Sequence, residues 1–177
     1  VRGLGDIGLA TAVLLARRGH DVLGGDVLEY VVEGVNSGRL HLAEPGLEEP
    51  LNDALASGKL RASCEVSSAE VFIIAVPTPV TPSLGPDLSY VYAAVDAIAD
   101  CLSAGVLVVL ESTSPVGTSR VLSERLAALR PELIFPHHSD SPDVYIAYCP
   151  ERVIPGRALI ELVENDRVIG GLSEACT

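Results

Sequence analysis

The sequence predicts an α/β fold built on a doubly wound parallel sheet, in which helices cover both faces of the strands. Short apolar runs alternate with segments whose apolar residues recur at helical spacing, as in successive strand-helix units. The runs over residues 71–76 and 106–110 contain no polar residue. Such runs are typical of parallel strands that are covered on both faces.

The chain opens with the motif G-x-G-x-x-G, formed by Gly3, Gly5 and Gly8, directly before an apolar helical pattern over residues 9–18. Glycine permits a tight turn from strand to helix and lets backbone N–H groups approach a pyrophosphate. The positive N-terminal end of the helix then faces the phosphates. Asp6 brings a negative charge to this end, so we expect it either to point to solvent or to weaken cofactor binding.

A second strand, predicted over residues 21–26, ends in Asp26, which follows the last glycine of the motif by 18 residues. In a βαβ unit, an acid at this position accepts hydrogen bonds from the adenosine ribose and repels the 2′-phosphate of NADP. The motif alone is a weak signal, because a glycine-rich turn and a surface aspartate also occur without a cofactor. Together with its strand and acid, it predicts a Rossmann-like domain that binds NAD.

The remaining elements follow from apolar periodicity and from residues that end helices. Predicted helices over residues 27–36 and 47–56 each stop at a Ser-Gly pair, and a loop over residues 39–46 separates them. Further strands are predicted over residues 60–63, 71–76, 105–111, 133–135, 145–149 and 167–170, and further helices over residues 87–102, 117–129 and 157–163. Asp87 or Ser89 caps the first of these three helices.

The composition excludes several classes of protein. With 177 residues and 48% apolar content, the chain can bury one sizeable core, so we expect one domain. A net charge of −12 argues against nucleic acid as a partner. The apolar runs are far too short to span a membrane, and we see no signal-peptide pattern. Widely spaced cysteines without a C-x-x-C pair predict reduced thiols in a cytoplasmic protein. Its four cysteines are widely spaced, and neither they nor the histidines predict a metal site.

The first strand is expected to be incomplete. Only Val1 and Arg2 precede Gly3, and the chain has no initiator Met. A first strand ordinarily supplies about five or six residues.

Three segments follow predicted parallel strands, at the sheet edge where ligands bind. They cover residues 76–79, 111–118 and 149–156, and each offers hydroxyl groups or charges. Ordinary turn chemistry accounts for the Pro, Ser, Thr and Gly of any one segment taken singly. Their common edge favours a ligand site.

In this order, the motifs resemble the UDP-glucose/GDP-mannose dehydrogenase family, and the resemblance covers essentially the whole chain. The segments that carry it are the glycine motif, Val-Pro-Thr-Pro at 76–79, Glu-Ser-Thr-Ser-Pro-Val-Gly-Thr at 111–118 and Tyr-Cys-Pro-Glu-Arg-Val at 148–153. Residues 146–171, with 38–41 and 44–47, are most similar to the family members that oxidise UDP-N-acetyl-D-mannosamine.

The resemblance implies oxidation of the C6 alcohol of a UDP-sugar to a carboxylate, in two steps that reduce two NAD, for the synthesis of polysaccharide precursors. The family's catalytic cysteine, lysine and asparagine lie beyond the NAD-binding domain, as do its central dimerisation helix and its sugar-nucleotide-binding domain. We therefore expect residues 1–177 to be the NAD-binding domain alone, inactive by itself, of a protein that is a homodimer or larger.

The resemblance also implies roles for single residues. Thr113 resembles a hydroxyl that contacts NAD and helps hold a catalytic water, Glu151 a glutamate that binds substrate and supports proton transfer, and Arg152 and Val153 a substrate-contacting pair. The cofactor-binding residues expected are Gly3, Gly5, Asp6, Ile7, Gly8, Asp26, Val76, Pro77, Thr78, Ser112 and Thr113. Without a ligand, Glu151 would cap a helix and Arg152 would form a surface ion pair.

Three other hypotheses remain open at this stage. The chain could be a dinucleotide-binding module without complete catalysis. It could serve a dehydrogenase for another nucleotide sugar, UDP-glucose or GDP-mannose. A related NAD enzyme of the 6-phosphogluconate or hydroxyacyl dehydrogenase type is disfavoured by the Cys-Pro-Glu-Arg stretch at 149–152.

Overall fold

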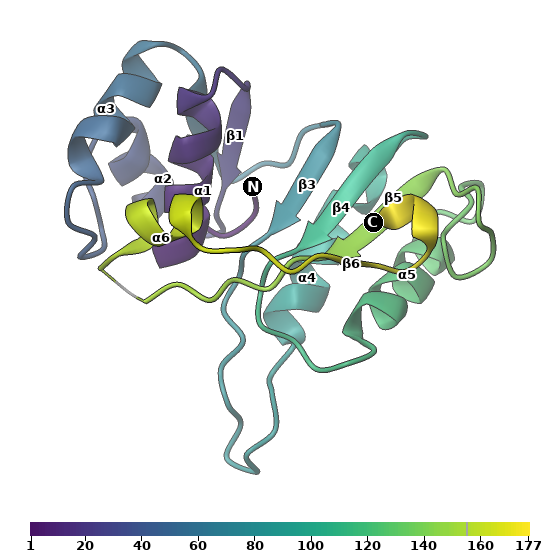
Figure 1. Cartoon of the computed structure of the whole chain (residues 1–177). Coiled ribbons are helices and arrows are strands. Elements are labelled where there is room, and N and C mark those ends of the chain that lie inside the picture. Colours follow the sequence, from purple (N-terminus) through teal and green to yellow (C-terminus); the bar gives the residue numbers. More distant parts are fainter. Residues whose placement is uncertain (155) are drawn as a thin grey trace. The chain divides into compact units, whose positions relative to one another are not determined.

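A computed structural model of the chain describes residues 1–154 and 156–177 (Figure 1). Two compact units are present, each assembled from separate stretches of sequence. The first unit contains Val1–Glu65 and Glu151–Asp166, and the second contains Val66–Pro150 and Arg167–Thr177. Pro155, part of the predicted segment 149–156, lies outside the described residues.

The first unit is a parallel strand pair with helices. Its elements are α1 (Asp6–Arg17), β1 (Val22–Gly25), α2 (Glu29–Asn36), α3 (Glu48–Ala56), β2 (Leu60–Ser63) and α6 (Ala158–Glu164). The start of the chain runs parallel to β1: the Val1 amino group donates to the Leu23 carbonyl (2.9 Å), and the Gly25 N–H donates to the Val1 carbonyl (2.7 Å). These bonds bring the glycine motif to the end of β1.

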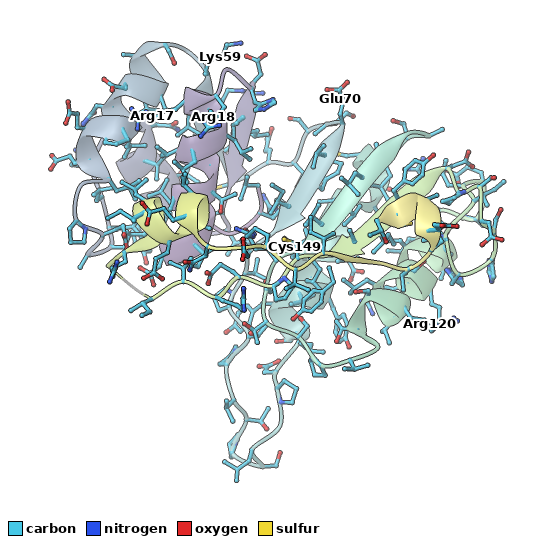
Figure 2. All side chains as sticks on the ribbon, viewed as in Figure 1. Arg17, Arg18, Lys59, Glu70, Arg120 and Cys149 are labelled. Atoms are coloured by element: carbon cyan, nitrogen blue, oxygen red, sulfur yellow. The ribbon has the colours of Figure 1, made fainter. Side chains whose placement is uncertain are left out.

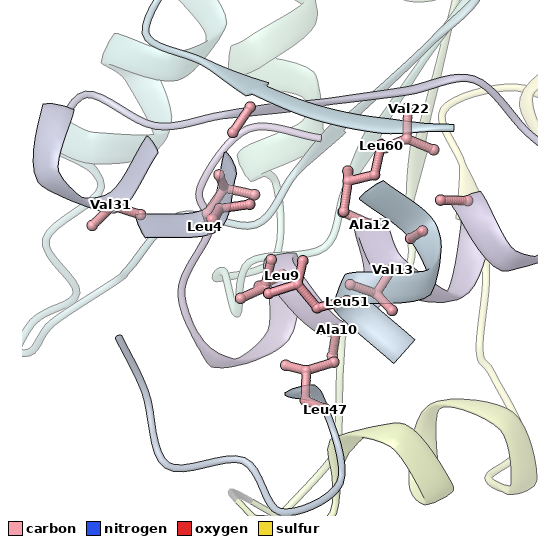
Figure 3. Close-up of a cluster of buried hydrophobic side chains, with 14 of the residues drawn as sticks. Leu4, Leu9, Ala10, Ala12, Val13, Val22, Val31, Leu47, Leu51 and Leu60 are labelled. Carbon is pink, nitrogen blue, oxygen red and sulfur yellow. The ribbon is translucent and has the colours of Figure 1, made fainter. Parts of the chain in front are cut away.

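The core of the first unit lies between α1 and its neighbours (Figure 3). Leu9 and Val13 from α1 are fully buried with Leu4, Leu47 and Leu51. Burying each such side chain contributes about 1.5–3 kcal/mol. The helical spacing of these apolar residues therefore decides which face of α1 turns inward.

The second unit is a sheet with strand order β3-β4-β5-β6. Its elements are β3 (Val71–Ile74), α4 (Ser89–Ile98), a 3₁₀ turn η1 (Ala99–Cys101), β4 (Val106–Leu110), α5 (Thr118–Leu129), β5 (Val144–Tyr148), β6 (Gly170–Gly171) and a 3₁₀ turn η2 (Glu174–Cys176). Strands β3, β4 and β5 pair in parallel. The predicted cap by Asp87 or Ser89 is wrong, because α4 has Leu88 as its N-cap residue and no side-chain cap hydrogen bond; Asp87 Oδ1 accepts the Ser89 N–H (2.9 Å) in the turn before the helix.

The predicted α/β architecture with parallel strands is confirmed, whereas the last predicted strand is wrong in extent and direction. We predicted a strand over residues 167–170, but β6 covers only Gly170–Gly171 and runs antiparallel to β5. The Arg167 side chain instead bonds Glu111 and Cys149, which directly follow β4 and β5. The neighbouring Val168 and Ile169 are exposed. An apolar run at a sheet edge therefore need not join the ladder.

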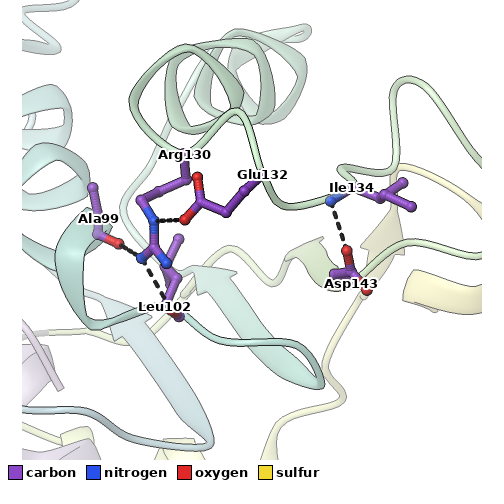
Figure 4. A network of polar contacts seen from close by, with 6 residues as sticks. All are labelled: Ala99, Leu102, Arg130, Glu132, Ile134 and Asp143. Carbon is purple, nitrogen blue, oxygen red and sulfur yellow. Dashed lines mark hydrogen bonds and ion pairs between the residues drawn. The ribbon is translucent and has the colours of Figure 1, made fainter.

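The strand predicted over residues 133–135 is also wrong. These residues form a loop fixed by polar contacts at both ends (Figure 4). Arg130 donates from Nη1 to the Ala99 carbonyl (2.5 Å) and the Leu102 carbonyl (3.0 Å). Asp143 accepts the Ile134 N–H through Oδ2 (2.8 Å). The apolar character of the segment reflects Phe135, which is fully buried in the core of the second unit.

Among the described residues, none of the helices is both long enough and apolar enough to cross a membrane.

Phe135→Ala should lower the free energy of unfolding by about 3–5 kcal/mol, because it leaves a cavity in a closed core. The neighbouring Ile134 is 48% exposed, so Ile134→Ala should cost no more than about 1 kcal/mol. Urea denaturation of the two variants measures the difference. Equal losses would mean that Phe135 does not anchor the loop to the core.

Candidate functional site

The glycine motif forms the predicted turn. Gly3 has a φ of 91°, a left-handed conformation that favours glycine, and its N–H donates to the Gly25 carbonyl (2.8 Å). Gly5 is the residue before α1, and among the described residues no side chain caps this helix. A Cβ at Gly5 would meet no atom within 4 Å. The first N–H groups of α1 and the open space beside them fit a pyrophosphate.

Asp26 lies against this turn. Its Oδ2 accepts the Leu4 N–H (2.9 Å) and its Oδ1 accepts the Leu28 N–H (3.0 Å). A carboxylate has about four acceptor positions, so both oxygens keep capacity for the hydroxyl groups of a ribose. The structure thus brings together the acid and the glycine motif that the sequence analysis assigned to one cofactor.

A buried arginine beside Asp26 was missed as a possible contributor to the site. Arg2 is 8% exposed, and its Nη1 has no hydrogen-bond partner among the described residues. Burial lowers the pKa of Arg2, while the charges of Asp26 and Cys64 oppose this shift. A Cβ at Gly25 would lie 2.2 Å from Nη1, so this glycine leaves the space that the guanidinium occupies. The signal in the sequence was an arginine in a short apolar strand.

The two remaining predicted residues of the glycine motif differ in exposure. Asp6 is exposed in the first turn of α1, and Ile7 is half-buried. An exposed carboxylate at this end of the helix is compatible with both alternatives proposed for Asp6. Its effect on cofactor binding stays a prediction.

In the second unit, Ser112 joins the ends of two parallel strands. It is buried, and its hydroxyl donates toward the Val76 carbonyl (2.7 Å) and the Ile74 carbonyl (3.2 Å). Pro77 is exposed and Thr78 is half-buried just beyond. The segments after β3 and β4 that the sequence placed at one sheet edge are therefore linked directly.

Thr113 is presented to solvent by a loop that is held on both sides. The Ser114 N–H donates to the Tyr148 hydroxyl (3.1 Å), and the Ser114 hydroxyl donates to the Ser112 carbonyl (3.0 Å). Thr113 itself is exposed, so its hydroxyl is accessible to a ligand.

An ion pair at the ends of β4 and β5 was not predicted. Arg167 Nη2 lies 2.6 Å from Oε1 of the buried Glu111, and Arg167 Nε donates to the Cys149 Sγ (3.4 Å). Figure 2 labels Cys149 among the side chains of the molecule. Burial disfavours the charge of Arg167, but its bonds to Glu111 and Cys149 outweigh burial and raise its pKa. Cys149 is thus buried and bonded by arginine, and the family resemblance places the expected catalytic cysteine beyond this domain.

The predicted substrate-contacting residues belong to the stretch Glu151–Asp166 of the first unit. Glu151 is half-buried, Val153 packs against the first core, and Arg152 is exposed and donates from Nη2 to the Asp166 carbonyl (2.8 Å). The helix-capping alternative for Glu151 is wrong, because α6 begins only at Ala158 and another acid bonds its N-terminal backbone.

The family model for the NAD-binding domain of the UDP-glucose/GDP-mannose dehydrogenases matches residues 1–177. The chain belongs to the UDP-glucose/GDP-mannose dehydrogenase family. In this family the domain binds NAD, and the glycine turn with Asp26 fits that cofactor. The family, predicted from four ordered motifs, is therefore confirmed, and so are the cofactor and the Rossmann-type fold.

Relatives within the family include two enzymes of related names. The chain is 51% identical to an NDP-N-acetyl-D-galactosaminuronic acid dehydrogenase of Ralstonia nicotianae and 47% identical to the UDP-N-acetyl-D-mannosamine dehydrogenase of Escherichia coli. Each alignment covers 100% of the chain and 42% of the relative. The chain thus spans well under half the length of these enzymes.

Solved structures of the family share the fold. The UDP-D-ManNAc dehydrogenase of Pyrococcus horikoshii has a TM-score of 0.91 and 40% identity, over 99% of this chain and 41% of that one. The GDP-mannose dehydrogenase of Pseudomonas aeruginosa has a TM-score of 0.87 and 26% identity, over 99% of this chain and 41% of that one.

Asp26→Asn should weaken NAD binding about 10- to 100-fold, because hydrogen bonds to a charged group contribute about 1.5–3 kcal/mol. It should also reduce the preference for NAD over NADP, since the repulsion of the 2′-phosphate disappears. Calorimetric titration with both cofactors measures the two effects.

Asp21→Asn is the matched control. Asp21 precedes the same strand at its other end, is 85% exposed and pairs only at the surface with Lys59 (2.9 Å). Its replacement should leave both affinities unchanged. Equal affinity of the Asp26 variant and the unaltered protein would remove the ribose-binding role.

Proposed function

We propose that this chain supplies the NAD-binding part of a dehydrogenase that oxidises the C6 alcohol of UDP-N-acetyl-D-mannosamine to the uronic acid. The observation that carries the proposal is the match of the entire chain, at 47% identity, to the E. coli enzyme of that name. The glycine turn and Asp26 support it independently, because they provide the groups that an NAD-dependent oxidation needs.

The overall reaction sets what the protein must provide. One primary alcohol, two NAD⁺ and one water give one carboxylate, two NADH and three protons. Bound NAD accepts the hydride in each of the two steps. The chain's own residues have to bind the cofactor, hold the sugar nucleotide and move protons to and from the C6 oxygen and the water.

Glu151 is the residue to which we assign proton transfer. A carboxylate at a site closed to water suits general-base work, and the half-buried position of Glu151 supports this assignment. We assign to the exposed Thr113 a contact with NAD and with the reacting water, because its hydroxyl both donates and accepts hydrogen bonds.

Arg152 and Val153 are assigned to substrate binding. The guanidinium of Arg152 is exposed and carries donors beyond the Nη2 group that bonds Asp166, which suits the diphosphate of a nucleotide sugar. Val153 packs against the first core and thereby fixes the backbone beside Arg152.

A second candidate substrate is the corresponding N-acetylgalactosamine nucleotide. The specific observation in its favour is the higher identity, 51%, to the Ralstonia enzyme named for the galactosaminuronic acid. Both sugars carry an N-acetyl group, so the shared proposal is a nucleotide-activated N-acetylhexosamine. UDP-glucose and GDP-mannose are the less favoured substrates.

Calorimetric titration of the chain with NAD and NADP, followed by an assay for NADH formation by the full-length protein that contains it, tests the proposal. We expect NAD to bind more tightly than NADP. The assay compares UDP-N-acetylmannosamine, UDP-N-acetylgalactosamine, UDP-glucose and GDP-mannose.

The outcomes separate the hypotheses. Turnover of UDP-N-acetylmannosamine supports the first proposal, and preferential turnover of UDP-N-acetylgalactosamine supports the second. Binding of NAD by the chain without turnover of any sugar nucleotide by the full-length protein favours a dinucleotide-binding module without complete catalysis. Binding of neither cofactor contradicts the proposal altogether.

A further inference from the structure

Glu44 is a buried acid in the loop between α2 and α3. Its side chain belongs to a residue that is only 4% exposed, although the loop around it contains exposed residues such as Pro45 and Gly46. A carboxylate is almost never buried to this extent unless it is hydrogen-bonded or paired. Its partners therefore indicate what the acid is for.

Both oxygens of Glu44 bond backbone N–H groups that lie more than 110 residues further along the chain. Oε2 accepts the Gly156 N–H (2.8 Å), and Oε1 accepts the Ala158 N–H (2.6 Å). Hydrogen bonds to an ionised acceptor are shorter and about twice as strong as those between neutral groups. One carboxylate thus clamps the turn that leads into α6.

The two hydrogen bonds of Glu44 act on a stretch of the first unit that lies, in the sequence, between the two parts of the second unit. Glu151–Asp166 follows 85 residues of the second unit and precedes its last 11, yet it packs with the first unit. Two of its anchors are apolar, the fully buried Ala158 and the core contact of Val153. Apolar contacts are non-directional. The two hydrogen bonds to Glu44 instead fix the position and the orientation of the backbone N–H groups of Gly156 and Ala158.

A hydrogen bond and an ion pair to Glu161 connect the residues on either side of this turn, so a change at the Glu44 bonds also affects the backbone toward residue 151. The Ile154 N–H donates to Glu161 Oε2 (3.0 Å), and Arg157 pairs with Glu161 (3.1 Å). Gly156 has a φ of 87°, so the backbone direction changes at the residue whose N–H Glu44 accepts. Loss of the clamp would therefore release the backbone at Gly156 and Ala158 and weaken the hold on Ile154.

We propose that Glu44 is the positioning residue of the substrate-contacting segment, holding the backbone at Gly156 and Ala158, and with it residues 151–154, on the NAD-binding unit through its two hydrogen bonds. The inference rests on the proposed function, because it takes Glu151, Arg152 and Val153 as contacts of the sugar nucleotide. Glu44 touches neither cofactor nor substrate in this proposal.

The chemistry requires a carboxylate at this position. A glutamine has one acceptor oxygen, so its amide nitrogen would face one of the two N–H donors and leave it unsatisfied. An aspartate keeps the charge but is one methylene shorter. Glu44→Gln should therefore break at least one of the two hydrogen bonds to Gly156 and Ala158, and Glu44→Asp should retain them in part.

Hydrogen exchange tests the clamp directly. In Glu44→Gln the amides of Gly156 and Ala158 should exchange about 10- to 100-fold faster than in the unaltered protein, while the amides of α1 keep their rates. Glu49→Gln is the charge-matched control, because Glu49 is exposed in α3. It should change neither set of amides.

Steady-state kinetics of the full-length protein that contains this chain, with NAD and UDP-N-acetylmannosamine, test the positioning role. Glu44→Gln should lower kcat/KM for the sugar nucleotide by about 10- to 100-fold and leave the KM for NAD within about twofold, because only the substrate segment moves. Glu44→Asp should recover part of the loss. A merely destabilised domain would instead weaken NAD binding as well.

Each result decides one claim. Unchanged exchange at Gly156 and Ala158 would overturn the clamp, and faster exchange with unchanged sugar kinetics would overturn its positioning role. Equal loss of NAD and sugar affinity would reduce Glu44 to a structural residue. Absence of sugar turnover in the full-length protein that contains this chain would contradict the proposed function, and the exchange rates would still decide the clamp.

Discussion

The structure of the first unit depends on backbone hydrogen bonds between the start of the chain and β1. They set Gly3 beside Gly25, so that the turn into α1 begins where β1 ends. The carboxylate of Asp26 then accepts the N–H of Leu4 and closes the turn from the other side. The same acid thus stabilises the turn, and in the proposed function its remaining acceptor positions would bind the ribose of NAD.

In the second unit, side-chain hydroxyl groups hold the loops at the ends of the strands. There the hydroxyl of Ser112 bonds the carbonyls of Ile74 and Val76, and Tyr148 holds the backbone of Ser114. Neutral hydroxyl groups fasten the loops and leave Thr113 exposed between them. The buried pair of Glu111 and Arg167 lies at the same strand ends, where its mutual attraction offsets the cost of burial only because the contact is close.

Local sequence signals succeeded where a segment's own residues determine its structure. The apolar run over 106–110 forms β4, the apolar face of α1 follows from helical periodicity, and the predicted strand over 60–63 has those bounds in the structure. The prediction over residues 133–135 failed because Phe135 is buried by a loop that Arg130 and Asp143 hold from outside. Apolar character reports burial, and it does not say whether the buried backbone is a strand.

The sequence by itself determined the family, the NAD-binding turn and the residues expected to serve it, because glycine spacing and the acid after β1 are local patterns. Only the tertiary structure decided that Arg2 lies buried beside Asp26, that Arg167 pairs with Glu111, and that Glu44 bonds the turn before α6. Each of the last two contacts joins residues more than 50 positions apart. No local periodicity encodes such a contact, since it arises only when packing brings distant segments within hydrogen-bonding distance.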